Sequence, residues 1–464
     1  MSSEKELGEL REQVADKTRE IIDSIAARNA LAKRIGAVKT RDSLPLEDGR
    51  VEDSLVRLVI QECEDKGVDV QTGLKVLSAV LAEGKRVQGF QTKKSLITPM
   101  MMSTKAREIE ATGKKLLRLD VGEPDFHPPR AVLDATSEAL YGFKTHYTGT
   151  RGIPELVTAV RRYLERRYHY SAKETELMSM PGGRFGVYMA LSTTVKEGEG
   201  IVVIEPNWPA YKEVLQFIGG RASTVHTTLE EAWEPSVEAV HDAIRPNTRA
   251  ILLSYPANPT GKIISPAKFK AIVDLANDHR LTVISDEIYN DYAYTECPSI
   301  LGSGAQKFIL TSSFSKTWAM TGFRVGYVVS SEENIAKMMK IQSLAITSVP
   351  EFIQYGAVKA LDSDAEVAQN SRAMKERIEA ACRELDEIGA LQYVRPDGAM
   401  YVFPQARAVD FDSNAFTMKL LEQKGVTVSP GSGFGDYPRC FRISLGGSME
   451  TIVDGIRKIG ELLG

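Results

Sequence analysis

Apolar residues recur at helical spacing through the first forty residues of the chain. They are Leu7, Leu10, Val14, Ile21, Ile25, Leu31 and Ile35. No proline precedes Pro45, so nothing in this stretch forces a helix to break. The pattern predicts one helix from Leu7 to Val38, about 48 Å long at roughly 1.5 Å per residue. A helix of that length extends beyond what one small domain can cover.

Two shorter helices are expected after Pro45 and Gly49 interrupt the first pattern. One runs from about Val51 to Lys66, and the other runs from about Asp69 to Gln88. Three helices of this size, one of them much longer than the others, enclose only a thin core. The pattern therefore predicts an all-α three-helix bundle that a second chain completes.

The pattern changes after the polar stretch Gln91–Ser95. Short apolar runs now end in loops that contain Pro, Gly or polar residues, at 201–211, 250–261, 281–289 and 308–316. Helical patterns such as Ala267–Asp278 lie between these runs. Buried strands that alternate with helices predict an α/β fold with a large, mostly parallel sheet covered on both faces. Ligands of such sheets bind at the carboxyl ends of the strands, and the unusual residues gather at those ends.

These changes of pattern predict the domain organisation. We expect a helical domain at 1–90, a linker at 91–98 and an α/β part at 99–464. Within the α/β part, a large domain covers about 140–345 and the flanking segments build a small domain.

Composition and charge narrow the classes of partner. A net charge of -4 and a pI near 6.0 give no reason to expect nucleic acid or an anionic membrane as partner. The four cysteines are far apart and form no CxxC pair, so we expect neither disulfides nor a metal site. The charged start lacks the apolar segment of a signal peptide, and no run of 18 apolar residues occurs. A cytoplasmic protein is expected.

Candidate chemistry follows consecutive strands of the predicted sheet. Asn258 begins the turn Asn-Pro-Thr-Gly, Asp286 ends an apolar run, and Lys316 ends the motif Ser-Phe-Ser-Lys. Each feature alone has an ordinary interpretation, as a turn, a helix cap or a solvated lysine. Their ordered occurrence at successive strand ends is different. Over essentially all of Leu96–Gly464 the sequence resembles the fold-type I, class I aminotransferases.

The resemblance implies pyridoxal 5'-phosphate (PLP) as cofactor and assigns roles around its ring. Lys316 would hold the cofactor aldehyde as a Schiff base and then move the α-proton of the substrate. Asp286 would keep the ring nitrogen protonated, which makes the ring an electron sink. Asn258 and Tyr289 would bind the phenolic oxygen, and Trp208 would stack on the ring.

The same resemblance implies sites for the phosphate and the substrate. The phosphate would be held by the start of a helix and by nearby polar side chains, at Gly182, Gly183, Ser313, Ser315 and Arg324. Arg442 would bind the substrate α-carboxylate as a two-pronged fork, with Gly122 lining the same pocket. Tyr147 corresponds to a tyrosine that reaches the cofactor from the neighbouring subunit.

Two other classes of protein share this scaffold. A regulator would carry a basic winged helix, whereas basic and acidic residues nearly balance in 1–95 and show no helix-turn-helix pattern. A PLP-dependent lyase shares most of the cofactor residues and stays open as an alternative.

Arg184 separates subgroups of the aminotransferases. It occupies the position at which one subgroup, including bacterial aspartate and prephenate aminotransferases, has a lysine that pairs with the distal carboxylate of the substrate. The alternative is an arginine at a helix start that touches phosphate or solvent.

Three basic residues of the first helix suggest a second site. Arg28 and Lys39 are eleven residues apart, which leaves them about 20° apart on one helix face. Arg11 lies roughly 100° away from that face, so it cannot easily serve the same site within its own bundle. The alternative is that this charged helix has no catalytic site and only forms a dimerisation coil. Over about 4–90, however, the sequence resembles the all-helical chorismate mutases, in which the matching arginine reaches the site of the partner.

The resemblance implies a rearrangement of chorismate to prephenate, which needs cations and no general base. Arg11 and Arg28 would hold the carboxylates, while Lys39 and Gln88 would face the breaking ether bond. The segment that carries Arg50 and Glu52 is one residue shorter than in the family, which leaves the register of both residues open. Gly84 stands where a serine is common, so an inactive or regulatory domain remains an alternative.

The two resemblances together predict a bifunctional enzyme of aromatic amino-acid biosynthesis. Its substrates would be chorismate, then prephenate or phenylpyruvate, with glutamate or aspartate as amino donor. We expect a homodimer or a higher homo-oligomer. The alternative is an aspartate or aromatic aminotransferase whose helical domain only dimerises or senses an effector.

Overall fold

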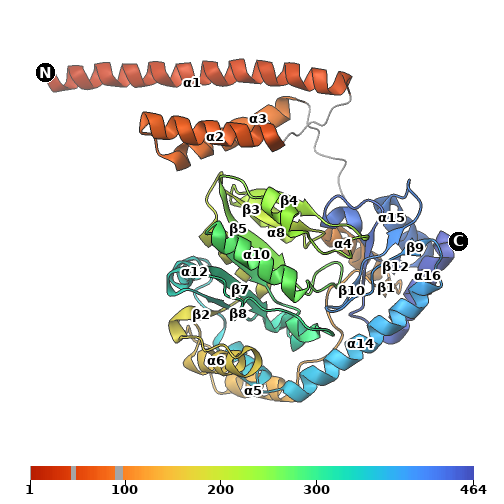
Figure 1. Cartoon of the computed structure of the whole chain (residues 1–464). Helices are drawn as coiled ribbons and strands as arrows, with labels where there is room; N and C mark the ends of the chain where they lie inside the picture. Colours follow the sequence, from red (N-terminus) through yellow and green to blue (C-terminus); the bar gives the residue numbers. More distant parts are fainter. Residues whose placement is uncertain (1, 43–48, 89–97) are drawn as a thin grey trace. The chain divides into compact units, whose positions relative to one another are not determined.

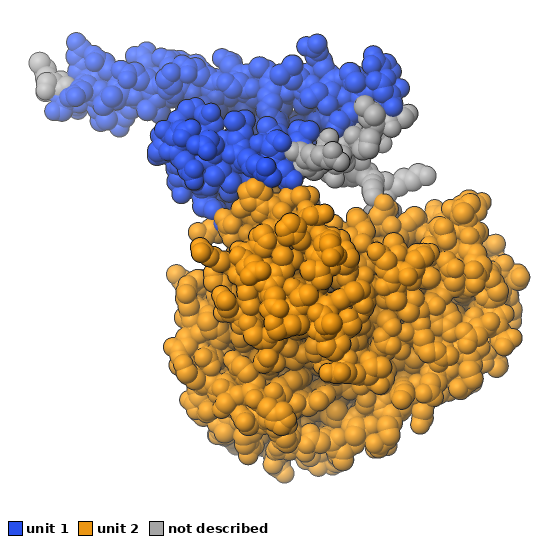
Figure 2. Space-filling view, viewed as in Figure 1, with its two compact units in different colours: residues 1–95, 197–199 blue, residues 96–196, 200–464 orange. Residues whose placement is uncertain are grey.

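The computed structural model describes residues 2–42, 49–88 and 98–464. The chain forms two compact units (Figure 2). The first contains residues 1–95 with 197–199, and the second contains 96–196 and 200–464. Most of the expected linker 91–98 lies outside the described residues. Among the residues that are described, no helix is long and apolar enough to cross a membrane.

The described residues of the first unit form three helices, which Figure 1 draws in red and orange. They are α1 (Ser2–Arg41), α2 (Gly49–Lys66) and α3 (Val70–Val87). Asp69 caps α3, because its carboxylate accepts a hydrogen bond of 2.9 Å from the backbone amide of Thr72. The all-helical prediction is confirmed, and α1 extends beyond the predicted range at both ends.

The core of this unit lies between α2 and α3 and is small. Its buried members are Val56, Leu74 and Leu77. Large apolar side chains stay exposed along α1, at Leu7, Leu10, Val14, Ile21, Ile22, Leu31, Ile35 and Val38. Exposed apolar side chains in such number leave a face that the unit does not cover by itself.

The second unit is built on a seven-stranded sheet with the order β2-β8-β7-β6-β5-β3-β4 (Figure 1). The strands are β2 (Leu177–Met180), β3 (Gly200–Glu205), β4 (Arg221–His226), β5 (Thr248–Ser254), β6 (Thr282–Asp286), β7 (Phe308–Ser313) and β8 (Gly326–Ser330). Only β8 runs antiparallel to its neighbours, and the remaining pairs are parallel. The mostly parallel sheet is therefore confirmed. The carboxyl ends of the other six strands meet at one edge.

Helices cover both faces of this sheet because alternate strand residues point to opposite sides. Ile251 and Val283 belong to the core under α6 (Pro154–Tyr168), α10 (Pro266–Asp278) and α13 (Glu351–Ala360). Leu252 and Ile284 belong to the core under α7 (Gly183–Thr194), α8 (Ala210–Phe217) and α12 (Glu332–Ala345). The remaining helices of this part are α5 (Arg130–Tyr141), α9 (Val237–Asp242) and α11 (Phe314–Thr317).

A smaller part combines the segments that flank the large sheet. Its helices are α4 (Pro99–Glu110), α14 (Asp364–Asp386), α15 (Ser413–Lys424) and α16 (Met449–Leu463). Its short strands are β1 (Leu117–Arg118), β9 (Leu391–Gln392), β10 (Tyr401–Val402), β11 (Gln405–Ala406), β12 (Val426–Thr427), β13 (Ser429–Pro430) and β14 (Phe441–Ser444). Parallel pairing of β1 with β12 joins the beginning of the second unit to its end.

Candidate active site

A cavity of about 680 Å³ opens at the carboxyl edge of the large sheet. It brings together residues that the sequence predicted from separate motifs. They are Gly122, Gly183, Arg184, Trp208, Asn258, Asp286, Tyr289, Ser315, Lys316, Arg324 and Arg442. Gly182 directly precedes the lining residue Gly183, and Ser313 lies two residues before the lining residue Ser315. Tyr147 is not among the lining residues, and 87% of its surface is exposed.

Lys316 reaches the cavity from α11, directly after β7. Its Nζ donates a hydrogen bond of 2.5 Å to the carbonyl oxygen of Gly122. Burial, together with the positive charges of Arg442, Arg324 and Arg184, lowers the pKa of Lys316 to about 8. The amine is therefore closer to its neutral, nucleophilic form than an exposed lysine would be.

Asp286 is buried at the end of β6 and uses only one of its two carboxylate oxygens. Oδ2 accepts a hydrogen bond of 2.8 Å from the hydroxyl of Tyr211. Burial raises the pKa of Asp286 to about 6, although the bond from Tyr211 opposes this shift. Oδ1 is buried and has no hydrogen-bond partner among the described residues. A buried oxygen without a donor fits a protonated ring nitrogen placed in the cavity.

The predicted phosphate cradle lies where β2 meets α7 and where β7 meets α11. Gly182 has a φ of 80°, and a Cβ there would lie 2.5 Å from Nη2 of Arg324, so the close approach of the arginine requires glycine. Ser313 donates a hydrogen bond of 2.8 Å to the hydroxyl of Ser315. The first amides of α7 face the cavity at Gly183. Free amides, hydroxyls and a guanidinium together suit a phosphate.

Arg442 is fixed from two sides and still has a free donor. Nη1 donates to Oδ1 of Asn258 at 2.9 Å, and Nη2 donates to the carbonyl oxygen of Asp120 at 2.5 Å. Its guanidinium carbon lies 4.6 Å from the ring centre of Tyr401 and 5.0 Å from that of Phe434. Nε is buried without a partner among the described residues. A fixed, partly unsatisfied guanidinium fits a carboxylate ligand.

Sequence reasoning missed two tyrosines of this site. Tyr211 holds Asp286, and Tyr401 bonds the hydroxyl of Tyr289 at 2.6 Å. Tyr211 lies three residues after Trp208 on the next helix turn, which was a weak signal. Tyr401 gave no signal, because it comes from the small part of the chain.

Arg184 projects into the cavity from the first turn of α7. Its guanidinium carbon lies 4.8 Å from the ring centre of Trp208, which is within the range of a cation–π contact. It forms no ion pair with a described residue. A cation held over an aromatic ring in this way is available to an anionic ligand.

The helical unit brings Arg28 of α1 into contact with α3. Arg28 donates a hydrogen bond of 2.8 Å to the carbonyl oxygen of Val80. A Cβ at Gly84 would lie 2.9 Å from Nη1 of Arg28, so a serine at this position would have to displace the guanidinium. Lys39 is half-buried on the same helix.

Gln88 ends α3 close to α1. A Cβ at Gly36 would lie 2.8 Å from the backbone oxygen of Gln88. Glu52 forms an ion pair of 2.9 Å with Lys85 of α3, a residue that the sequence did not indicate. The side chain of Arg50 lies outside the described residues. Arg11 is exposed on α1, away from these residues as its position on the helix predicts.

Comparison with known proteins decides the family. Residues 114–459 match the family of class I and II aminotransferases. The chain belongs to this family. It is a PLP-dependent aminotransferase, and the residues of its cavity fit that cofactor. Residues 10–89 match type II chorismate mutase, so the enzyme is a fusion of a chorismate mutase domain with the aminotransferase.

Individual relatives cover nearly the whole aminotransferase part. A protein of Aquifex aeolicus named "Probable aspartate/prephenate aminotransferase" is 31% identical over 393 residues, which is 81% of this chain and 99% of that protein. A (5-formylfuran-3-yl)methyl phosphate transaminase of Methanocaldococcus jannaschii is 33% identical over 77% of this chain and 94% of its own. The structure of Thermus thermophilus aspartate aminotransferase with maleate has a TM-score of 0.76 at 30% identity, covering 82% of this chain and 98% of that one.

Proposed function

We propose that this enzyme rearranges chorismate to prephenate in its helical domain and aminates prephenate to arogenate in its PLP site. Glutamate or aspartate would serve as amino donor. The observation that carries the choice of prephenate is the unpaired Arg184 in the cavity. The chorismate mutase match in the same chain supplies the source of the keto acid.

The helical domain offers cations for the first reaction. Arg28 is oriented by the carbonyl of Val80, and Lys39 and Gln88 lie toward the same end of α1. The rearrangement needs a dianion held in a reactive conformation and stabilisation of charge on the ether oxygen. Arginine, lysine and a glutamine amide supply both without a general base.

For the second reaction, bound PLP supplies an electron sink for the α-carbon of the amino acid. Nζ of Lys316 removes the α-proton of the amino acid and delivers it to the cofactor. Its lowered pKa favours this proton transfer near neutral pH. Arg442 holds the α-carboxylate with its free Nε and its fork. Oδ1 of Asp286 keeps the proton on the ring nitrogen.

Arg184 would select substrates with a second carboxylate. Prephenate, glutamate and aspartate carry one, while phenylpyruvate and phenylalanine do not. A charge-assisted hydrogen bond contributes about 1.5–3 kcal/mol, which corresponds to about a ten- to hundredfold preference. The name of the Aquifex aeolicus relative includes both aspartate and prephenate.

We also propose a homodimer, which would complete both sites. Tyr147 is exposed and does not line the cavity of its own chain, as expected for a residue that reaches the site of a partner. Arg11 points away from the Arg28 face of α1. The exposed apolar side chains of α1 provide a surface for the partner.

Mass spectrometry of a single reaction mixture tests the proposed function. Chorismate plus glutamate or aspartate should yield arogenate at neutral pH, which has to be kept because arogenate breaks down in acid. Arg184→Ala should slow the dicarboxylic substrates much more than phenylalanine.

Two results would favour the alternative of an aromatic or aspartate aminotransferase. One is phenylpyruvate aminated far faster than prephenate, with Arg184→Ala slowing both classes equally. The other is a full-length enzyme that leaves chorismate unchanged, in which case the helical domain would dimerise or sense an effector.

A further inference from the structure

Five cationic side chains line the cavity, and two of them have no hydrogen-bond or ion-pair partner among the described residues. The five are Arg107, Arg184, Lys316, Arg324 and Arg442. Lys316, Arg324 and Arg442 serve the amine, the phosphate and the α-carboxylate. The guanidinium groups of Arg107 and Arg184 make no hydrogen bond or ion pair to any residue that the structure describes. Arg184 was expected from the sequence, whereas Arg107 was not.

Arg107 belongs to the face of α4 that forms one wall of the cavity. The lining residues of this helix recur every three or four positions, at Pro99, Met100, Ser103, Thr104 and Arg107. Met102 and Ala106 point the other way and are fully buried. The helix is therefore amphipathic, with its apolar side fixed in the small part and its polar side turned to the substrate space.

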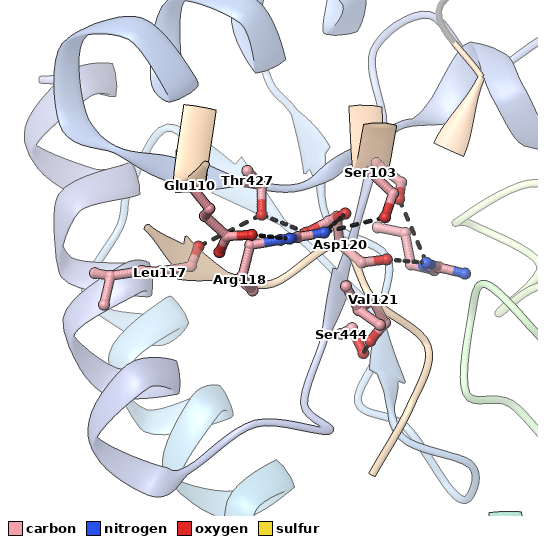
Figure 3. Close-up of polar contacts among 10 residues, drawn as sticks. Ser103, Glu110, Leu117, Arg118, Asp120, Val121, Thr427 and Ser444 are labelled. Atoms are coloured by element: carbon pink, nitrogen blue, oxygen red, sulfur yellow. Dashed lines mark hydrogen bonds and ion pairs between the residues drawn. The ribbon is translucent and has the colours of Figure 1, made fainter. Parts of the chain in front are cut away.

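A clamp of polar contacts holds this wall in place (Figure 3). Arg118 donates hydrogen bonds of 2.8 Å to Glu110 and 3.0 Å to Ser103, both on α4. It also binds the carboxylate of Asp120 through two bonds of 2.8 and 3.0 Å. Arg107 lies between Ser103 and Glu110, the two residues of α4 that Arg118 binds. The backbone of Arg107 is therefore fixed relative to Asp120, whose carbonyl oxygen accepts a hydrogen bond from Arg442.

We propose that Arg107 is a specificity-determining residue that binds the distal carboxylate of dicarboxylic substrates together with Arg184. This inference rests on the proposed use of dicarboxylic substrates. Two guanidinium groups that line the same cavity, one from α4 and one from α7, can each satisfy one carboxylate oxygen. A monocarboxylic aromatic substrate leaves both arginines to solvent. Because Arg107 is exposed at the cavity wall, its contribution is expected to be about three- to fivefold rather than larger.

The test compares Arg107→Leu and Arg107→Lys with a control on the same helix. Lys105 carries the same charge but does not line the cavity, and its Nζ lies 3.8 Å from Glu422, so Lys105→Leu is the matched control. We would measure the half-reaction of the full-length holoenzyme with glutamate and with phenylalanine. We would also measure the binding of maleate, an unreactive dicarboxylate, by calorimetry.

Arg107→Leu should lower the ratio of kcat/KM for glutamate to that for phenylalanine about three- to fivefold and weaken maleate binding by a similar factor. Arg107→Lys should recover part of both, and Lys105→Leu should change neither. An unchanged ratio and unchanged maleate affinity in Arg107→Leu would overturn the inference. In that case, continued formation of arogenate from chorismate would leave the proposed function standing. If no arogenate forms from chorismate but the ratio still depends on Arg107, the proposed function fails and the inference about Arg107 stands.

Discussion

Burial changes the acid–base behaviour of the two residues on which cofactor chemistry depends. The pKa of Lys316 falls from 10.5 to about 8. At pH 7 about a tenth of this amine is neutral, compared with about one in three thousand at the unshifted pKa. The pKa of Asp286 rises only to about 6, so the carboxylate remains mostly ionised at pH 7 and can pair with a protonated ring nitrogen. One environment therefore raises the neutral fraction of the amine and leaves the acid mostly charged.

Substitution of Lys316 should separate the two activities. Lys316→Ala should lose the visible absorbance of lysine-bound PLP and transamination, because no other amine in the cavity can replace Nζ. The same variant should convert chorismate at the wild-type rate, because the helical unit is a separate domain. Absorbance spectra and an assay of chorismate loss measure both. Lys307→Ala, which removes an exposed lysine beside β7, is the control. Normal transamination by Lys316→Ala would contradict the cofactor assignment.

At the scale of elements, the segment that follows β1 positions several functional groups of the site. Three successive carbonyl oxygens, those of Asp120, Val121 and Gly122, accept hydrogen bonds from Arg442, Ser444 and Lys316 respectively. Arg118 fixes the segment through the buried Asp120 (Figure 3). The clamp joins α4 and the segment after β1 to β12, because Thr427 of β12 also donates a hydrogen bond to Asp120.

Loss of the clamp should weaken the binding of both substrate classes. Arg118→Met leaves the carboxylate of Asp120, whose side chain is 0% exposed, without its guanidinium, at a cost of about 3 kcal/mol in the free energy of unfolding. We expect KM for both glutamate and phenylalanine to rise, about tenfold, because Arg442 loses its fixed position. The absorbance of lysine-bound PLP should also titrate at a different pH, because the Gly122 carbonyl shifts.

A second arginine, paired with a glutamate, serves as a control that distinguishes loss of positioning from loss of stability. Arg457 binds Glu384 through two bonds of 2.9 Å in the same small part, far along the chain from the clamp. Arg457→Met should leave KM and the absorbance titration unchanged. Arg118→Met/Asp120→Asn should regain stability, because no buried charge remains, and should still show the raised KM. Wild-type KM values and titration in Arg118→Met would refute the positioning role.

At the scale of the whole molecule, the helical unit exposes a surface that predicts assembly. Val14, Ile21 and Ile22 of α1 are 66%, 58% and 60% exposed, which is unusual for apolar residues spaced along one helix. Arg11 and Arg28 lie on different faces of that helix. We therefore expect each mutase site to combine Arg28 of one chain with Arg11 of the other.

Mixing two inactive variants tests this arrangement. Arg11→Ala and Arg28→Ala should each lose about 10²–10³ in chorismate mutase rate. Coexpression of both variants should restore about a quarter of wild-type activity, because half of the dimers are mixed and each of these has one intact site of two. The assay is loss of chorismate, with Lys39→Ala plus Arg28→Ala as the control pair, since these residues share one chain's site. No recovery in the first pair would rule out the interlocked arrangement.

The sequence by itself determined the fold class and predicted many of the residues of both candidate sites. Helical periodicity predicted the three helices of the first unit, and buried runs that end in special residues predicted the parallel sheet. Lys316, Asp286 and Asn258 could be found because the carboxyl ends of neighbouring strands meet at one edge. The position of Arg11 relative to Arg28 followed from helix geometry alone. These inferences depend on the repeat of a local conformation, which the order of residues fixes.

Only the tertiary structure decided which distant residues complete the site. Tyr211 bonds Asp286 across 75 positions, Tyr289 bonds Tyr401 across 112, and Arg442 bonds Asn258 across 184. The placement of Arg107 in the cavity wall likewise depends on how α4 packs on the small part. Such contacts have no periodic signal along the chain, because their partners are brought together by the packing of whole elements. The sequence therefore predicted residues of the candidate site, and the packing of whole elements determined their hydrogen-bond partners.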